Sequence, residues 1–171
     1  MADEQKSRLT HLTPADFEVL AHIARRIWLE HYTKIISIEQ IEYMLAGRYT
    51  AESLSRYMNS SERWCNLLKL GDETIGYCSH SLTANPEEIK LEQLYVLPAH
   101  HGKGYGGFML RHIEAHARTL GRPLIMLTVN KHNTGSIAVY RHSGFTVREE
   151  AVFDIGNGYV MDDFVMEKRL A

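Results

Sequence analysis

A glycine-rich stretch between a strand-like segment and a helix-like segment restricts the fold of this 171-residue chain more than any other feature. Residues 100–107 contain four glycines, follow the strand-like residues 89–97, and precede a helical apolar stripe that stops at Gly121. The first N–H groups of a helix lack internal acceptors and carry partial positive charge, so such a loop suits a phosphate. Lys103 adds a full positive charge to it. The stretch therefore predicts a strand, an anion-binding loop and a helix in succession.

Two familiar nucleotide-binding loops do not account for this stretch. A P-loop requires Ser or Thr after its lysine, whereas Gly104 follows Lys103. The dinucleotide fingerprint requires a parallel βαβ unit that opens the domain. A flexible turn that only caps the following helix is the structural alternative.

The apolar residues of the remaining segments follow either the period of a helix or that of a strand. Thr13, Pro14 and Asp16 form a helix start, with Thr as N-cap, Pro at the first position and an acid in the first turn. The apolar spacing predicts helices over residues 17–28, 38–57 and 133–143. Gly47 weakens the continuity of the second of these helices. Strand patterns cover residues 7–12, 64–70, 74–82, 89–97, 124–129, 147–155 and 159–167.

This order predicts an α/β (α+β) fold in one domain, residues 1–171, with a mixed, mostly antiparallel sheet flanked by helices. Lys and Arg number 19 and Asp and Glu 21, a net charge of −2, which excludes a chain whose main task is to coat nucleic acid or anionic membrane. Cys65 and Cys78 cannot make a disulfide framework, and residues 1–14 lack the apolar core of a secretory signal. No run reaches the ~18 apolar residues of a membrane helix. We therefore expect a cytoplasmic protein.

Three separate segments, matched in order and spacing, carry a resemblance to a known family. The first is the strand of residues 91–98, and the second is the loop with His101, Gly104 and Gly106. The third contains Asn130, Asn133, Ser136, Tyr140, Gly144 and Phe145. Together they resemble the GNAT superfamily of N-acetyltransferases, which transfer acetyl from acetyl-coenzyme A to an amine. The resemblance implies a GNAT fold with a splayed central strand pair, and acetyl-CoA as co-substrate without a metal.

The resemblance also implies how the coenzyme is held. The backbones of Leu94, Tyr95 and Val96 would pair with the pantetheine arm. The loop would hold the pyrophosphate through His101, Gly102, Lys103, Gly104, Tyr105, Gly106 and Gly107. The family's loop usually opens with Gln or Arg, so the histidine predicts weaker or more pH-sensitive binding. Asn133 and Ser136 would contact the coenzyme arm or its adenosine side, and their alternative role is to cap the helix.

Direct attack of an amine on a thioester needs a base, a stabilised oxyanion and a proton for the thiolate. Tyr140 matches the family's tyrosine near the sulfur, which implies a general acid; aromatic packing is the alternative. Glu92 shares a strand face with Leu94 and Val96. It is the candidate base, acting through water, and a solvated or amine-binding carboxylate is the alternative. The backbone N–H of Val96 would meet the oxyanion.

A weaker resemblance, to the bacterial spermidine/spermine N-acetyltransferases, indicates the acceptor. Residues 30–32 and 154–168 carry it. Aromatic and acidic side chains on the first two helices, such as Trp28 and Glu42, suit a cationic alkylamine through ion pairs and cation–π contacts. The candidate acceptor-binding residues are Glu30, Tyr32 and Asp162. Asp163 could take the place of Asp162, and a charged hairpin rim explains both equally well.

Two other functions remain open. A protein or peptide N-terminal or lysine acetyltransferase would use the same chemistry, and a non-catalytic acetyl-CoA sensor would use the loop alone. Tyr140 and Glu92 argue against the sensor. We expect a small-molecule amine as partner, without nucleic acid or membrane, and the C-terminal hairpin offers an open edge for a homodimer.

Two further sets of chemically active side chains have structural explanations. His112 and His116 lie one helical turn apart but lack a third metal ligand, so we expect an exposed helix flank. Cys65 and Cys78 alternate within strands and are expected to be small core residues, which argues against an acyl-cysteine route.

Overall fold

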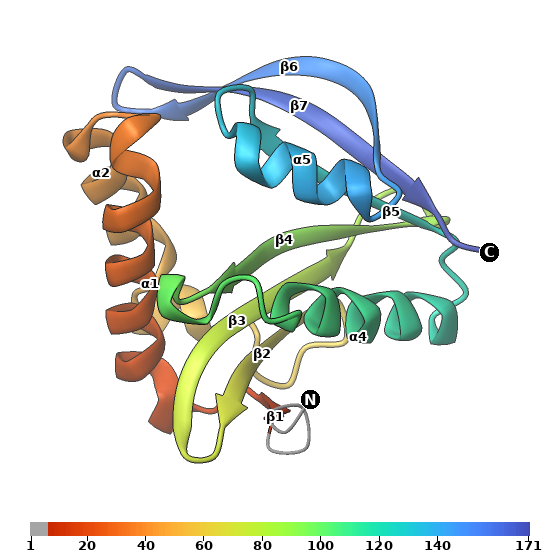
Figure 1. Ribbon diagram of the computed structural model, residues 1–171, viewed down its shortest axis with the longest axis horizontal. Helices are drawn as coiled ribbons and strands as arrows, with labels where there is room; N and C mark the ends of the chain where they lie inside the picture. Colours follow the sequence, from red (N-terminus) through yellow and green to blue (C-terminus); the bar gives the residue numbers. More distant parts are fainter. Residues whose placement is uncertain (1–6) are drawn as a thin grey trace. The chain divides into compact units, whose positions relative to one another are not determined.

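The computed structural model describes residues 7–171, whose seven strands are hydrogen-bonded in the order β1-β2-β3-β4-β5-β7-β6 (Figure 1). The strands are β1 (Ser7–His11), β2 (Arg63–Leu70), β3 (Glu73–Leu82), β4 (Glu88–Val96), β5 (Leu124–Asn130), β6 (Thr146–Gly156) and β7 (Tyr159–Arg169). The α-helices are α1 (Phe17–His31), α2 (Ile38–Arg48), α3 (Ala51–Ser55), α4 (Tyr105–Thr119) and α5 (Thr134–His142). Short 3-10 turns are η1 (Pro14–Asp16), η2 (Tyr32–Lys34) and η3 (Pro98–His100).

The β4–β5 pair is parallel, and β1–β2, β2–β3, β5–β7 and β6–β7 are antiparallel. The predicted α/β (α+β) fold with a mixed, mostly antiparallel sheet is therefore confirmed. Residues 1–6, part of the stretch that lacks a signal-like apolar core, lie outside the described residues. Within residues 7–171, every helix falls short of the length and hydropathy that a bilayer crossing requires.

The chain forms two compact units, and β4 and α4 contribute residues to both. The first unit contains the residues up to Ser81 and Gln93–Arg111, and the second contains Leu82–Glu92 and His112–Ala171. The one-domain organisation expected from the sequence stays a prediction.

In the first unit, the first helix starts where its capping residues predict. The backbone N–H and the hydroxyl of Thr13 both donate to Oδ2 of Asp16, at 2.9 Å. Pro14 opens η1, which runs directly into α1. The apolar stripe of α1 is buried, as expected, through Leu20, Ile23, Ala24, Ile27 and Trp28. Period and capping together thus determine this helix locally.

The expected single helix over residues 38–57 is wrong. α2 continues through Gly47 and ends at Arg48, and α3 begins at Ala51. Thr50 accounts for the break, because its side chain accepts a hydrogen bond from the N–H of Ser53 and so caps a new helix. Tyr49 leaves the helical conformation, with φ −116° and ψ 22°, and its ring is buried. The break therefore lies two residues after the glycine that the sequence singled out.

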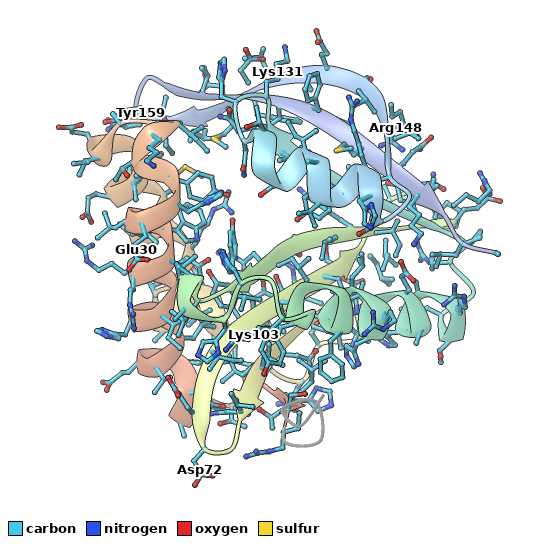
Figure 2. The ribbon with its side chains drawn as sticks, viewed as in Figure 1. Glu30, Asp72, Lys103, Lys131, Arg148 and Tyr159 are labelled. Atoms are coloured by element: carbon cyan, nitrogen blue, oxygen red, sulfur yellow. The ribbon has the colours of Figure 1, made fainter. Side chains whose placement is uncertain are left out.

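β2 and β3 form the predicted hairpin, and Figure 2 shows Asp72 at its turn. Gly71 has φ +62°, a left-handed conformation that suits glycine. Pairing shifts from Leu68↔Gly76 to Lys69↔Thr74, so one residue of β3 is extra. This bulge lies at Ile75, next to a glycine that approaches β4 closely.

In the second unit, β4 and β5 run together for a short distance only. The ladder joins Glu88, Ile89 and Lys90 to Leu124, Ile125 and Met126, and it ends there. β4 continues for six further residues, to Val96. The short ladder agrees with the splayed strand pair that the GNAT resemblance implies.

The C-terminal hairpin of the second unit leaves one long edge open. β7 pairs with both β5 and β6, so β6 is the terminal strand of the sheet (Figure 1). β6 is exposed at most of its eleven positions, Val152 and Phe153 included. Arg148 of β6 donates to Glu88 at 2.9 Å and to Glu167 at 3.1 Å, and burial of Glu88 makes these bonds necessary. The hydrogen bond that Arg148 donates to Glu88 raises the pKa of Arg148.

Candidate functional site

The glycine-rich loop belongs to the first unit and presents bare backbone. Gly102 and Gly104 have φ +76° and +87°, which only glycine adopts at little cost. A Cβ placed on either residue would meet no atom within 4 Å, so the surface of the loop is open. α4 begins at Tyr105, earlier than the sequence suggested. Gly106 and Gly107 therefore form the first turn of this helix instead of the loop.

This arrangement fits an anionic group such as a coenzyme pyrophosphate. The first intrahelical bond runs from the N–H of Phe108 to the carbonyl of Gly104, at 3.0 Å. The N–H groups of the first turn of a helix precede such a bond and have no acceptor within the helix, so they can serve an anion. Figure 2 shows the exposed Lys103 on the loop before α4. Backbone amides, the helix N-terminus and one ammonium group are together the donor set that phosphate requires.

His101, which the sequence assigns to a phosphate, also contacts the strand. Its Nε2 lies 2.8 Å from the carbonyl oxygen of Val96. A carbonyl can only accept, so Nε2 carries the proton, and Nδ1 can donate to a phosphate oxygen only in the imidazolium form, in which both nitrogens are protonated. His101 thus joins the loop to the end of β4.

β4 alternates between its two faces as the sequence predicts. Ile89, Leu91 and Gln93 are buried, whereas Glu92, Leu94 and Val96 are half-buried. The even-numbered residues therefore share one face, as expected for Glu92, Leu94 and Val96. On β3, Gly76 allows a close approach, because a Cβ there would lie 2.5 Å from the carbonyl oxygen of Tyr95.

An aromatic cluster, which we define as Trp28, Tyr32, Tyr49, Tyr77 and Tyr95, packs against the buried face of β4 in the first unit. Trp28 is only 1% exposed, and Arg48 lies 5.3 Å above its ring. The ring is therefore a core residue, as its place in the apolar stripe predicts, and it already carries a cation of the chain, so it offers no open cation–π surface to an acceptor.

Hydrogen bonds link the polar atoms of this cluster. The hydroxyl groups of Tyr49 and Tyr77 are 2.7 Å apart, and those of Tyr32 and Tyr95 are 2.8 Å apart. Burial raises the pKa of Tyr49 and Tyr77 well above the usual value, and that of Tyr95 as well. All three phenols therefore stay protonated at neutral pH. Tyr49 and Tyr77 were not among the functional residues expected from the sequence. For Tyr77, the sequence shows only an aromatic residue within the alternating pattern of β3.

The acids of the first two helices are partnered by arginines. Both carboxylate oxygens of Glu42 accept from Arg25, at 2.6 and 2.5 Å. This hydrogen-bonded pair lowers the pKa of Glu42 and raises that of Arg25. Glu30, labelled on α1 in Figure 2, lies 3.6 Å from Arg26 one turn earlier. A cationic acceptor would have to exchange with these arginines, which costs little because both pairs are exposed.

The second unit holds the remaining predicted residues. Asn133 is buried and caps α5, since its Oδ1 accepts from the N–H of Ser136 at 3.4 Å. Tyr140 is half-buried, and its ring packs 5.6 Å from that of Phe145. Glu92 is half-buried on β4. Asn133 thus has the capping role and Tyr140 the packing role that the sequence offered as alternatives. Their roles in coenzyme binding and catalysis stay predictions.

Asp162 of β7 is paired with a lysine. Its Oδ1 lies 2.9 Å from Nζ of Lys131, which also approaches Glu150 at 3.4 Å. The hydrogen bond with Asp162 raises the pKa of Lys131. Asp163 points to the opposite face of β7 and is 3% exposed. Of the two adjacent acids, Asp162 is the accessible one and Asp163 the buried one.

The two cysteines are core residues, as expected. Cys65 and Cys78 are both buried and free, and burial raises the pKa of Cys78 to about 12. Its thiol is therefore a poor nucleophile. Residues 7–171 contain no group of three His, Cys, Asp or Glu side chains that could hold a metal ion.

A strand that leads into an amide-rich loop and a helix N-terminus, without a P-loop lysine, defines a class of enzymes that bind a phosphate-bearing coenzyme through the backbone. The model of the Acetyltransferase (GNAT) family matches residues 20–145. The chain therefore belongs to the GNAT family of acetyltransferases, and it is an acetyl-CoA-dependent N-acetyltransferase.

Relatives of known structure and sequence agree with this family. A spermidine N(1)-acetyltransferase of Thermoplasma acidophilum is 30% identical over 162 residues, 92% of this chain and 94% of the relative. The crystal structure of the PaiA N-acetyltransferase from Thermoplasma acidophilum in complex with coenzyme A has a TM-score of 0.81 and 25% identity, covering 95% of this chain and 98% of the other. The spermidine N-acetyltransferase from Vibrio cholerae, in complex with CoA and spermine, has a TM-score of 0.70 at 17% identity over 96% of each chain, a likeness of fold.

Proposed function

We propose that the chain acetylates a primary amine of a small, polyamine-like cation by direct attack within a ternary complex. The 30% identity to a spermidine N(1)-acetyltransferase over 92% of the chain is the observation that carries the choice of acceptor. The open glycine loop and the helix N-terminus support the coenzyme half of the proposal. The two units together form one acetyltransferase domain over residues 1–171, since the family match spans both.

The coenzyme is held mainly by backbone groups. The amides of Gly102–Gly107 and the Lys103 ammonium bind the pyrophosphate, with Nδ1 of His101 as a further contact. The backbones of Leu94, Tyr95 and Val96 pair with the pantetheine arm, and Asn133 and Ser136 contact the coenzyme at the start of α5. Few formal charges are needed, because oriented amides supply most of the attraction.

Three groups of the chain serve the transfer itself. Glu92 removes the proton of the attacking ammonium group through a water molecule, and the amine nitrogen then forms its bond to the acetyl carbon. The N–H of Val96 stabilises the negative charge that develops on the carbonyl oxygen. Tyr140 gives its hydroxyl proton to the sulfur as the carbon–sulfur bond breaks. Two protons leave the nitrogen in all: Glu92 passes the first to solvent, and the second, lost after the nitrogen has bonded to the acetyl carbon, restores the hydroxyl of Tyr140, so the step balances.

The acceptor is held by carboxylates and by a hydroxyl-bearing aromatic. Glu30 and Asp162 exchange their partners Arg26 and Lys131 for the ammonium groups of the acceptor, and Tyr32 contributes from η2. A cationic alkylamine is protonated at neutral pH, so such carboxylates both attract it and favour its charged form until Glu92 acts.

A steady-state assay of free-thiol release, with acetyl-CoA and a panel of polyamines, amino acids and peptides, tests the proposal. Spermidine or spermine should give the highest kcat/KM. A peptide preference would indicate the N-terminal or lysine acetyltransferase instead. Coenzyme binding by calorimetry without thiol release from any acceptor would indicate the sensor and overturn the proposal.

Glu92→Gln tests the base. The variant should lose about 10²-fold in kcat at neutral pH, in the range expected for a general base, with coenzyme affinity retained. Wild-type turnover by the variant would show that Glu92 is not the base.

The proposal includes a homodimer that pairs through β6. Val152 and Phe153 are 64% and 41% exposed on this terminal strand, and unpaired backbone along its edge is a template for a second strand.

Light scattering after size exclusion tests this interface. The wild-type chain should be a dimer at micromolar concentration, and Phe153→Lys should be a monomer. Val139→Lys is the matched control, because Val139 is 57% exposed on α5, away from the β6 edge, and this variant should remain a dimer. A monomeric wild-type chain would overturn the homodimer.

A further inference from the structure

The end of β4 is fastened on its buried face by side-chain hydrogen bonds. Gln93 accepts from the hydroxyl of Ser79 at 3.2 Å and donates to the hydroxyl of Tyr49 at 3.1 Å. That hydroxyl lies 2.7 Å from the hydroxyl of Tyr77, which also accepts from the indole N–H of Trp28 at 3.3 Å. One chain of polar atoms therefore connects β3, β4, the α2–α3 junction and α1.

Two residues farther along β4, Tyr95 makes a second connection. Its hydroxyl lies 2.8 Å from that of Tyr32, which opens η2 directly after α1. Its ring packs between those of Tyr77, at 5.3 Å, and Trp28, at 5.9 Å. Because Gln93 and Tyr95 share one strand face, their bonds leave the other face, with Leu94 and Val96, uninvolved.

The backbone at the same place has little freedom to move. The carbonyl of Tyr95 lies so close to Gly76 that a Cβ would be 2.5 Å away, and the N–H of Leu97 donates to Ile75 at 2.8 Å. On the loop side, His101 donates to the carbonyl of Val96. The residues that the proposed function gives to the pantetheine arm and the oxyanion are thus held from several directions.

The geometry points to the Tyr32–Tyr95 hydroxyl pair as a positioning device for acetyl transfer, which couples the segment next to Glu30 to the strand that holds the coenzyme. The inference rests on the proposed function for the roles of the two segments. Tyr95 and Tyr32 act indirectly, because their hydrogen bond fixes the positions of the Val96 backbone and of η2. Loss of either hydroxyl should therefore weaken coenzyme binding alike, because either loss removes the same hydrogen bond.

A double-mutant cycle with Tyr32→Phe, Tyr95→Phe and the double variant tests this coupling. Phenylalanine keeps the ring contacts and removes one hydrogen bond, which is worth about threefold to tenfold in an equilibrium or rate constant. Each single variant should lower kcat by about that factor and raise the coenzyme Kd. The acceptor KM should change less than twofold in Tyr95→Phe, whose residue has no proposed contact with the acceptor. The double variant should lose no more than either single variant.

Tyr57→Phe is the matched control, because Tyr57 belongs to the same unit but stacks under Arg63, outside the aromatic cluster. It should match the wild-type chain in every measurement. Multiplied effects in the double variant, or a lower urea midpoint with unchanged kcat and Kd, would overturn the coupling. Coenzyme binding measured by calorimetry needs no acceptor. The Kd values of the variants therefore test the coupling between Tyr32 and Tyr95 even if the wild-type chain shows no turnover and the proposed function fails.

Discussion

Gly76→Ala is the most informative single substitution, because it adds one carbon at the closest approach of β3 to β4. The new Cβ would lie 2.5 Å from the carbonyl oxygen of Tyr95 and 3.3 Å from Cα of Val96, whereas real Cβ atoms do not come nearer than 3.0 Å. The obstructing atoms belong to backbone, so no side chain can swing away. The strands must separate by at least about 0.5 Å, a small-to-large change that typically costs about 1–3 kcal/mol.

This separation should lower both the stability of the chain and its affinity for the coenzyme. Urea denaturation should show a loss of unfolding free energy in the range of about 1–3 kcal/mol. Calorimetry with coenzyme A should show a Kd raised about tenfold, because a 1.4 kcal/mol loss of binding energy corresponds to that factor. Displacement of the Tyr95 and Val96 backbones is the common cause of both effects.

Gly47→Ala provides the control. Gly47 lies within α2, and a Cβ there would meet no atom within 4 Å. Alanine should therefore stabilise the chain by roughly 0.5–1 kcal/mol and leave the coenzyme Kd unchanged. If Gly76→Ala unfolds and binds coenzyme like the wild-type chain, the end of β4 is free to move, and the reasoning about its rigid placement is refuted.

Other measurements bear on the acid and on the buried titratable groups. Tyr140→Phe keeps the ring contact with Phe145, so it should lower kcat by about 10²-fold, within the range for a general acid, at unchanged coenzyme Kd and urea midpoint; an equal loss of binding would make the residue structural. The Cys78 thiol, with its pKa raised to about 12, should react with a disulfide reagent at pH 8 only after denaturation. Burial raises the folded-state pKa of Cys78, Tyr49 and Tyr77. The contribution of these protonated groups to the stability of the folded chain is therefore complete below about pH 9 and is lost as the pH rises toward 12. The loss is about 4 kcal/mol for the cysteine alone. A urea midpoint that stays constant from pH 8 to 12 would contradict this.

Local patterns predicted most of the elements and the loop. The capping residues Thr13 and Asp16 and the apolar period set the start of the first helix, and Gly71 and Gly121 mark a turn and a helix stop. These signals act over a few residues, through backbone conformation and hydrogen bonds to near neighbours. They are legible without knowledge of the rest of the chain.

Predictions that depended on long-range partners were less secure. The helix over residues 38–57 is divided because Thr50 caps a new helix and the ring of Tyr49 is buried beside Tyr77, 28 residues away. Trp28 belongs to the apolar stripe and was also counted among the aromatics that suit the acceptor, and its burial decides for the core. The arginine partner of Glu42 lies on a different helix. Composition and spacing carry no record of such pairings, since they arise only when elements pack.

The sequence by itself determined the order of strands and helices and the glycine loop before α4, because both follow from short-range periodicity, capping and backbone freedom. Three matched segments also gave it a resemblance to the GNAT family. Only the tertiary structure decided that Tyr32 meets Tyr95, that Gly76 admits the carbonyl of Tyr95, and that His101 donates to Val96. These contacts join residues up to 63 positions apart. Their geometry depends on how two strands and a helix pack, and that packing is set by the sum of many weak contacts instead of by any one motif.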